Sequence, residues 1–255
     1  MFSIVHICFF IVVITLSIVS AILVSKKIGW HKRVLHVLCG LAILSEVTKI
    51  FYYFSFLVEG TENGYYLAPE WLPFHLCSIQ IIFIFMITFM KDGKVRNALM
   101  CFMYPTMMGG ALMALLIPVS SLYYSTFFSV LSLQYWLFHG MLIFLSLYMI
   151  ITKPIKFTMK SYFTAVIMAT GACFMAIYLN AILGGSATNV NFFYVARPPL
   201  PDLPVLNLNH GWFVYMFHLT WLGILVISLT YTPVFVKTIK DWRNKRKGTV
   251  ATSGR

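Results

Sequence analysis

Residues 71–80 read WLPFHLCSIQ and join a polar segment to a long apolar run. Proline suits the first turn of a helix, because it has no amide hydrogen to donate and its φ angle is already close to helical. We therefore predict a helix over residues 73–90, with His75 and Cys77 in its first two turns. The positive end of the helix dipole would lower the pKa of Cys77 and make it a candidate nucleophile. The alternative is that Cys77 is a small buried hydrophobic residue and His75 an anchor at the membrane surface.

The composition of the whole chain indicates a membrane protein. Its 255 residues are 60% hydrophobic and only 10% charged, with a mean hydropathy of +0.85, whereas soluble domains have roughly 25% charged residues. The five cysteines show no CxxC pair and no zinc-finger spacing, so we expect neither a metal nor a cofactor. The net charge of +12 is not concentrated in a recognisable nucleic-acid module, and we expect no nucleic-acid partner.

Seven apolar runs approach the roughly 20 residues that a helix needs to cross a bilayer. The third is short, and the fourth is interrupted by Pro105 and Gly109–Gly110. We predict an all-α bundle of seven transmembrane helices, which forms one domain over residues 1–236 and is followed by a disordered basic tail over residues 237–255. The runs are residues 4–24, 34–56, 73–90, 97–117, 128–151, 162–183 and 212–236.

The lysines and arginines predict how the bundle is oriented. Of the 19 basic residues, all except Lys49 and Arg197 lie in the first, third and fifth links or in the C-terminal tail. Basic residues are enriched in the cytoplasmic links of membrane proteins. We therefore place the N-terminus outside and the C-terminus in the cytoplasm, which puts Cys77 close to the outer face.

Ionisable residues inside a membrane are costly and usually face the interior of a bundle, so each one is a candidate for function. Glu46 and Lys49 are three residues apart on the second run and can pair with each other. His139 is expected at the same depth as Glu46, and a contact between them would orient the imidazole and raise its basicity. The alternative is that Glu46 and Lys49 only neutralise each other and fix the packing of helices.

A base for Cys77 is expected to come from another helix. His75 lies about 200° from Cys77 around a regular helix, so the two side chains would point apart. His218 is expected at nearly the depth of Cys77 and His139 deeper, while Gln80 shares the face of Cys77. The catalytic candidates are thus Cys77, His75, His139 and His218, and the candidates for substrate binding are Gln80, Glu46, Lys49, Asn180 and Arg197.

The last outer link, residues 184–212, is unusually long and reads GGSATNVNFFYVARPPLPDLPVLNLNHGW. Links of this length without regular structure are usually functional or disordered. This one is rich in aromatic residues and proline, so we expect it to pack as a lid over the outer end of the bundle. Arg197 could hold a phosphate or carboxylate in a bidentate contact, or it could pair with Asp202 and fix the loop.

Five stretches together resemble the YwaF-like family of seven-helix bacterial membrane proteins, which is related to the vertebrate transmembrane protein 164. They are LPFHLCSIQ, the fourth run with its glycine pair and its end in LLIP, LQYWLFHG, NFFYVARPP and HGWFVYMF, and they span about residues 71–235 in order. The vertebrate relative is regarded as an acyltransferase that remodels ether phospholipids through a cysteine. The resemblance implies that role for Cys77, which lies in the HLC stretch, with His139 of the FHG stretch as its base.

We therefore expect an integral membrane acyltransferase or transacylase that acts on phospholipid, or on another lipid acceptor, through a cysteine near the outer face. Membrane lipids are the expected partners, the resemblance implies a multi-pass protein of the bacterial cell membrane, and homo-oligomerisation stays open. One alternative is a transporter or binding protein for small solutes or ions, with a discontinuous helix at Pro105. Another is a scaffold without catalytic activity, whose polar residues only tie helices together.

Overall fold

A computed structural model describes residues 3–56, 68–117, 128–184, 189–200 and 203–252. All the regular structure in these ranges is helical, which confirms the predicted all-α class. The helices are α1 (Ile4–Ile28), α2 (Lys32–Phe56), η1 (Pro69–Trp71), α3 (Ile79–Phe89), α4 (Lys94–Leu116), α6 (Val130–Thr152), α7 (Met159–Leu183), η2 (Phe192–Tyr194), α8 (Trp212–Thr230) and α9 (Thr232–Thr252).

Six of these helices, α1, α2, α4, α6, α7 and α8, are long and apolar enough to cross a membrane. The third predicted span is represented by α3, which has only 11 residues, so the count of seven spans is not confirmed. The predicted start of this helix at Pro73 is wrong. Leu72 is extended (φ −62°, ψ 150°), as expected for a residue before proline, and residues 72–78 form a turn that brings the chain to the start of α3 at Ile79.

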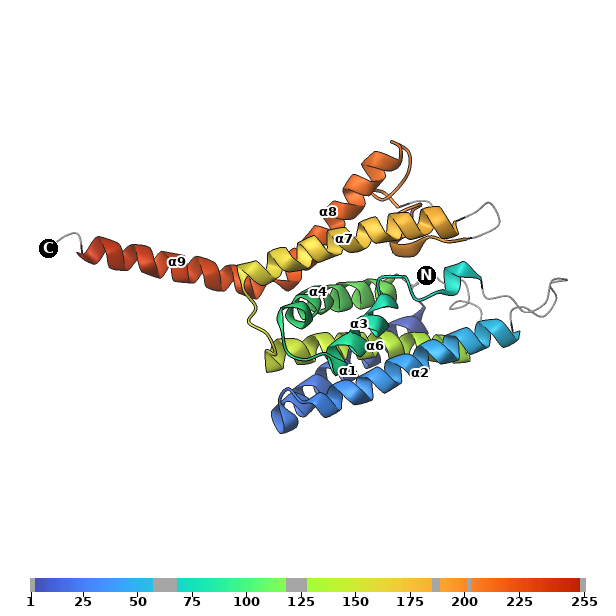
Figure 1. Cartoon of the computed structure of the whole chain (residues 1–255), viewed down its shortest axis with the longest axis horizontal. Helices are drawn as coiled ribbons and strands as arrows, with labels where there is room; N and C mark the ends of the chain where they lie inside the picture. Colours follow the sequence, from blue (N-terminus) through green and yellow to red (C-terminus); the bar gives the residue numbers. More distant parts are fainter. Residues whose placement is uncertain (1–2, 57–67, 118–127, 185–188, 201–202, 253–255) are drawn as a thin grey trace.

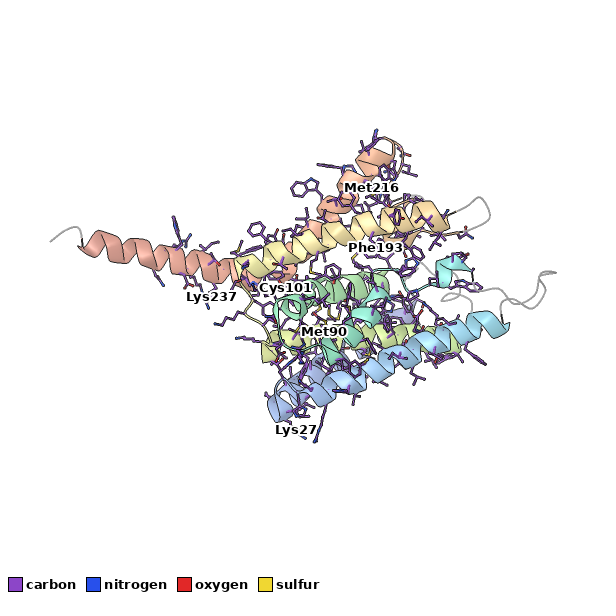
Figure 2. The ribbon with its side chains drawn as sticks, viewed as in Figure 1. Lys27, Met90, Cys101, Phe193, Met216 and Lys237 are labelled. Atoms are coloured by element: carbon purple, nitrogen blue, oxygen red, sulfur yellow. The ribbon has the colours of Figure 1, made fainter. Side chains whose placement is uncertain are left out.

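The helix α4 is the central element of the bundle. It contacts α3, α6, α7 and α8, and Met100, Met103 and Met107 on it are fully buried. Figure 1 shows α4 and α6 between α1 and α2 on one side and α7 and α8 on the other. In Figure 2, Lys27 and Lys237 lie toward one end of the bundle, and Phe193 and Met216 lie toward the other. The basic links therefore gather at one end, while the orientation of that end toward the cytoplasm stays a prediction.

The predicted break of the fourth helix at Pro105 is wrong, because α4 runs through it. Proline has no amide hydrogen, so the carbonyl of Cys101, four residues earlier, lacks its usual helical partner. The hydroxyl of Tyr231, which is fully buried, donates a hydrogen bond of 3.3 Å to this carbonyl. A residue from the end of α8 thus compensates the proline and keeps α4 continuous.

The seventh predicted run, residues 212–236, is divided between two helices. The helix α8 ends at Thr230, Tyr231 leaves helical geometry (φ −89°, ψ 4°), and α9 begins at Thr232. The tail that was expected to be disordered is helical to Thr252. Figure 1 shows α9 extending beyond the bundle, past the end at which α7 begins.

Two consecutive glycines of α4 let two other segments approach its backbone. A Cβ atom at Gly109 would overlap Cγ1 of Val226 on α8, and one at Gly110 would lie 3.3 Å from Sγ of Cys77. Small residues at such crossings are typical of membrane helices, because they allow backbones to pack closely. The glycine pair thus seats α8 on one side of α4 and the turn before α3 on the other.

We predict that Gly109→Ala destabilises the protein by about 1–3 kcal/mol, because the added methyl group must displace Val226 in a packed contact. Thermal unfolding in detergent measures this effect. Gly171→Ala on α7 is the matched control, since a Cβ atom there would meet nothing within 4 Å. An equal unfolding temperature for the two variants would contradict the proposed contact.

Candidate functional site

The turn over residues 72–78 places Cys77 against α4. The amide of Ile79 donates to the carbonyl of His75 (2.8 Å) and that of Gln80 donates to the carbonyl of Cys77 (3.2 Å), which tightens the turn just ahead of α3. The thiol is partly buried, with Sγ against Gly110. Cys77 therefore lies before the helix and not within its first two turns, as the sequence had predicted.

The turn lies outside the membrane-spanning helices, and the ionisation of its thiol is set by burial. Burial raises the pKa of Cys77 to about 12, because a thiolate there would lose its hydration. The prediction that the helix dipole lowers this pKa is therefore wrong. A dipole effect falls off within one turn and amounts to about 1 kcal/mol, whereas loss of water can shift a fully buried group by about 3–5 pKa units.

A short strained loop covers the turn. Phe193 and Tyr194 in η2 have φ angles of +56° and +57°, in the left-handed region that costs roughly 1–2 kcal/mol per non-glycine residue. The side chain of Asn180 on α7 holds this loop: it accepts from the amide of Phe192 (2.9 Å) and donates to the same residue's carbonyl (3.0 Å). The hydroxyl of Tyr215 donates to the carbonyl of Tyr194. Strain of this kind is common at functional sites.

His75 lies between the strained loop and α2. Its ring centroid is 5.3 Å from that of Phe192 and 6.0 Å from that of Tyr194. Burial, and secondly the nearby Lys49 ammonium, lower the pKa of His75 to about 4, so the imidazole is uncharged at neutral pH. Burial and the proximity of Cys77 raise the pKa of Tyr194, whose phenol stays protonated. The turn and η2 thus meet beside the thiol, and His75 connects this cluster with Lys49 of α2.

Lys49 approaches this cluster already paired. Its ammonium is 2.7 Å from a carboxylate oxygen of Glu46, one turn earlier on α2. His139 instead places Nδ1 2.7 Å from the carbonyl of Tyr135 on its own helix. The suggested contact between Glu46 and His139 is not among the contacts of the described residues.

The position of His139 follows from the register between α4 and α6. The hydroxyl of Tyr135 donates to the carbonyl of Ala114, and that of Ser146 donates to the carbonyl of Tyr104 at 2.8 Å. The two helices are therefore antiparallel, and equal numbers of residues along them cover nearly equal distances. His139, four residues after Tyr135, is level with Gly110, four residues before Ala114. His139 and the Cys77 sulfur thus lie at the same height along α4.

Gln80 is completely buried and binds the same face of α4 one turn below Gly110. Its Nε2 donates to the carbonyl of Leu76 (3.2 Å) and to the hydroxyl of Thr106 (3.1 Å). Since a carbonyl only accepts, the amide nitrogen must face Leu76. Both donors of Gln80 are used, and its Oε1 is buried without a hydrogen-bond partner among the described residues.

Two of the sequence candidates lie away from this cluster. His218 on α8 is half-buried, with Nδ1 3.0 Å from the carbonyl of Val205 in the last link. Arg197 is exposed and donates to the carbonyl of Asn189 at 3.0 Å. Its suggested partner Asp202 lies outside the described residues. Besides its two bonds to Phe192, the side chain of Asn180 donates to the carbonyl of Ala176 on its own helix (2.7 Å).

The most important residues that the sequence analysis missed are Tyr194 and Gly110. Tyr194 was within the quoted aromatic segment FFY, where a phenol is the only polar side chain. The glycine pair was taken as a helix interruption instead of a contact surface. Across the described ranges, no three His, Cys, Asp or Glu side chains are gathered as metal ligands.

The model of the TMEM164 family matches residues 1–231, which include every membrane-spanning helix and both loops of the site. No curated protein and no solved structure matches the chain. The match agrees with the relationship to transmembrane protein 164 that the sequence motifs indicated, while the YwaF-like branch and a bacterial origin stay predictions.

We predict that Asn180→Leu raises the rate at which N-ethylmaleimide alkylates Cys77 by about tenfold or more. The variant removes two hydrogen bonds to the strained loop, each contributing about 1 kcal/mol, and about 1.4 kcal/mol corresponds to a factor of ten in the open population. Peptide mass spectrometry measures the rate at Cys77. Thr164→Val on the same helix removes only a local hydrogen bond and should leave the rate unchanged. Equal rates in both variants would show that the loop does not cover the thiol.

Proposed function

The chain belongs to the TMEM164 family of membrane proteins, and from this premise we propose that it is a membrane acyltransferase with Cys77 as its nucleophile. The observation that carries the proposal is the position of the thiol. Cys77 lies against a glycine of α4, next to the protonated phenol of Tyr194 and level with His139. Acyl transfer requires a nucleophile, a base and a hydrogen-bond donor, and the proximity of Tyr194 to the thiol and the shared height of His139 and Cys77 along α4 support these roles.

In the first half-reaction, the Cys77 sulfur attacks the carbonyl carbon of a phospholipid ester. The thiol proton passes to an imidazole nitrogen as the S–C bond forms, because the raised pKa of the thiol disfavours a free thiolate. The ester C–O bond then breaks, and its oxygen takes the proton from the imidazolium. The products are a lysophospholipid and an acyl thioester on Cys77.

In the second half-reaction, the hydroxyl of an acceptor lipid attacks the thioester carbon. The acceptor's proton passes to the imidazole, the S–C bond breaks, and the sulfur takes up the proton to regenerate the thiol. The Oε1 atom of Gln80, which has no hydrogen-bond partner in the part of the chain that the structure describes, supports a role in positioning such a hydroxyl. Gln80 is a poor candidate for stabilising the oxyanion, because both of its donors are occupied. The phenol of Tyr194 is the better candidate for that role.

We assign the base to His139. Its Nδ1 faces the carbonyl of Tyr135, which can only accept, so Nδ1 carries the hydrogen and Nε2 the lone pair. His75 is the second candidate, because its lowered pKa keeps it uncharged. His218 is not proposed as a base, because its Nδ1 faces the carbonyl of Val205 in the last link and no contact of the described residues joins it to the turn that holds Cys77. Arg197 keeps its proposed role in holding a headgroup phosphate, since it is exposed beside η2.

The transporter alternative receives less support. An ion path through the membrane needs charged groups that are free to bind an ion, whereas Glu46 and Lys49 neutralise each other at 2.7 Å. The continuous α4 also removes the discontinuous helix that this alternative required.

We predict that Cys77→Ser abolishes transfer of an alkyne-tagged acyl chain from phosphatidylcholine to lysophospholipid in proteoliposomes. A serine hydroxyl is a much weaker nucleophile than a thiol. Mass spectrometry should also find a hydroxylamine-sensitive acyl group on Cys77 of the wild type. Cys8→Ser on α1, an exposed cysteine away from the turn and from α7 and α8, is the matched control and should retain activity and acylation. Activity that survives Cys77→Ser would refute the proposed nucleophile.

We predict that His139→Gln slows acylation of Cys77 by about 10²–10⁴-fold, the usual contribution of a general base, and that His75→Gln slows it by about tenfold or less. Quenched time courses of thioester formation measure both rates. The reverse order of effects would assign the base to His75. Unfolding temperatures of both variants exclude a general loss of folding as the cause.

A further inference from the structure

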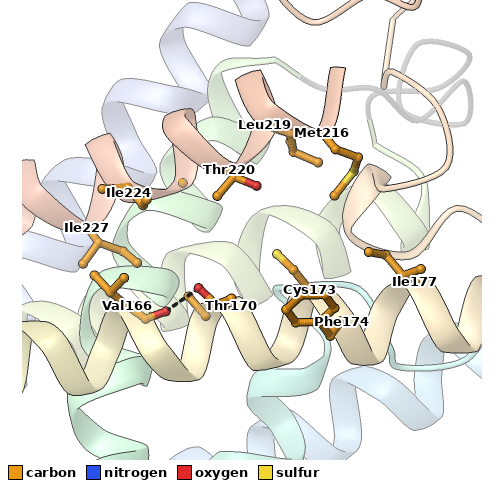
Figure 3. Close-up of a pocket in the computed structure, with 12 residues that line it drawn as sticks. Val166, Thr170, Cys173, Phe174, Ile177, Met216, Leu219, Thr220, Ile224 and Ile227 are labelled. Atoms are coloured by element: carbon orange, nitrogen blue, oxygen red, sulfur yellow. Dashed lines mark hydrogen bonds between the residues drawn. The ribbon is translucent and has the colours of Figure 1, made fainter. Parts of the chain in front are cut away.

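A furrow lies between α7 and α8 (Figure 3), two helices that lie on the side of α4 opposite to α6 (Figure 1). We call it the α7–α8 furrow and define it by Ala169, Thr170, Cys173, Ile177, Met216 and Gly223, which are among the residues that line it. Figure 3 shows side chains of both helices directed into the space between them. The hydroxyl of Thr170 donates to the carbonyl of Val166 on its own helix (3.0 Å) and is therefore satisfied.

The furrow is surrounded by surface that faces the membrane. Both helices are long and apolar enough to cross a bilayer, and Ile167, Phe174 and Leu225 beside it are 70%, 67% and 53% exposed. On membrane-spanning helices, exposed apolar side chains of this kind face lipid tails, which are as apolar as leucine. Any molecule that enters the furrow sideways therefore comes from the lipid phase.

The size of the furrow selects a narrow occupant. Its volume is about 120 Å³, well below the roughly 300–1,000 Å³ of sites that enclose drug-sized ligands. A Cβ atom at Gly223 would meet nothing within 4 Å, so the furrow has free space beside this glycine. A narrow channel whose lining is mostly apolar, with Thr170 and Thr220 as its hydroxyl-bearing residues, suits a segment of hydrocarbon chain and has no room for a headgroup.

We propose that the α7–α8 furrow binds one acyl chain of a membrane phospholipid and guides it toward Cys77. This inference rests on the proposed acyl transfer and names the element of the structure that receives the substrate. The bilayer delivers the lipid sideways, so no passage through water is needed.

Two packing contacts connect the furrow with the thiol. At one end, Ile177 and Met216 pack against the cluster that contains Phe192, and the ring of His75 packs against Phe192 as well. On α8, Val226 lies between Gly223 and Ile227, which both line the furrow, and packs onto Gly109 of α4. The next residue of α4, Gly110, carries the contact with Cys77. The helix α8, which forms one wall of the furrow, and the nucleophile thus pack against consecutive residues of α4.

The test uses the full-length protein in proteoliposomes that contain phosphatidylcholine with a diazirine in one acyl chain. After irradiation, mass spectrometry locates the cross-links. In the wild type and in Cys77→Ser, they should map to the furrow residues of α7 and α8. Gly223→Trp, which fills the furrow, should reduce these cross-links at least fivefold and slow acylation of Cys77. Leu225→Trp, on the same helix but beside the furrow, should change neither result.

A second variant keeps the test valid if Gly223→Trp does not fold. Ala169→Leu fills the furrow from α7 and should have the same effects in a smaller degree. Cross-links that fall outside the furrow, or that persist in both folded variants, would overturn the inference. So would copper-catalysed Cys173–Cys173 disulfides between two copies of the chain, because a second copy would then occupy the furrow.

The two proposals fail in different ways. If furrow cross-links are present but wild-type Cys77 never carries an acyl group, the acyl-transfer proposal fails and only the lipid-binding part of the inference stands. If Cys77 is acylated but Gly223→Trp leaves its rate unchanged, the furrow is not the route to the thiol and the inference is wrong.

Discussion

The candidate site depends on two close contacts with consecutive glycines of α4, Gly109 and Gly110. One glycine receives Val226 of α8, and the next receives the sulfur of Cys77. Because consecutive residues of a helix point about 100° apart, the pair fixes two different neighbours at one height. A side chain at either position would push one neighbour away, so the placement of the thiol and the packing of α8 are coupled through the same turn of helix.

Satisfied backbone groups are the second condition for this arrangement. A buried carbonyl or amide without a partner costs about 1–3 kcal/mol, and water is scarce at this depth. Tyr231 supplies the donor that Pro105 lacks, and Asn180 satisfies both polar groups of Phe192. Each of these side chains lets the backbone take an irregular path where a regular helix could not bring the site residues together.

Sequence reasoning succeeded where local patterns decide the structure and failed where distant residues do. The starts of α1 at Ile4 and of α8 at Trp212 were predicted correctly, because each helix begins where a long apolar run of the sequence begins. The path through Pro105 was not, because it depends on Tyr231, more than a hundred residues later in the chain. In the site, His75 and Cys77 share one turn because they are close in sequence, and the Lys49 ammonium lies near the His75 imidazole, while their functional roles stay predictions. The sequence could not place His218, since depth along a helix does not tell which face the residue is on.

Burial makes the thiol less reactive at rest, and this constrains how the site could work. A thiol with a pKa of about 12 is almost entirely protonated at neutral pH, so it resists alkylation and oxidation, which proceed through the thiolate. Attack then requires an ester close enough for the proton to leave as the new bond forms. A lipid that arrives along the α7–α8 furrow provides this condition by itself, because its ester is held near α4 only when its chain is bound. Reactivity would thus depend on the presence of substrate, which agrees with a nucleophile kept under a strained loop instead of in open water.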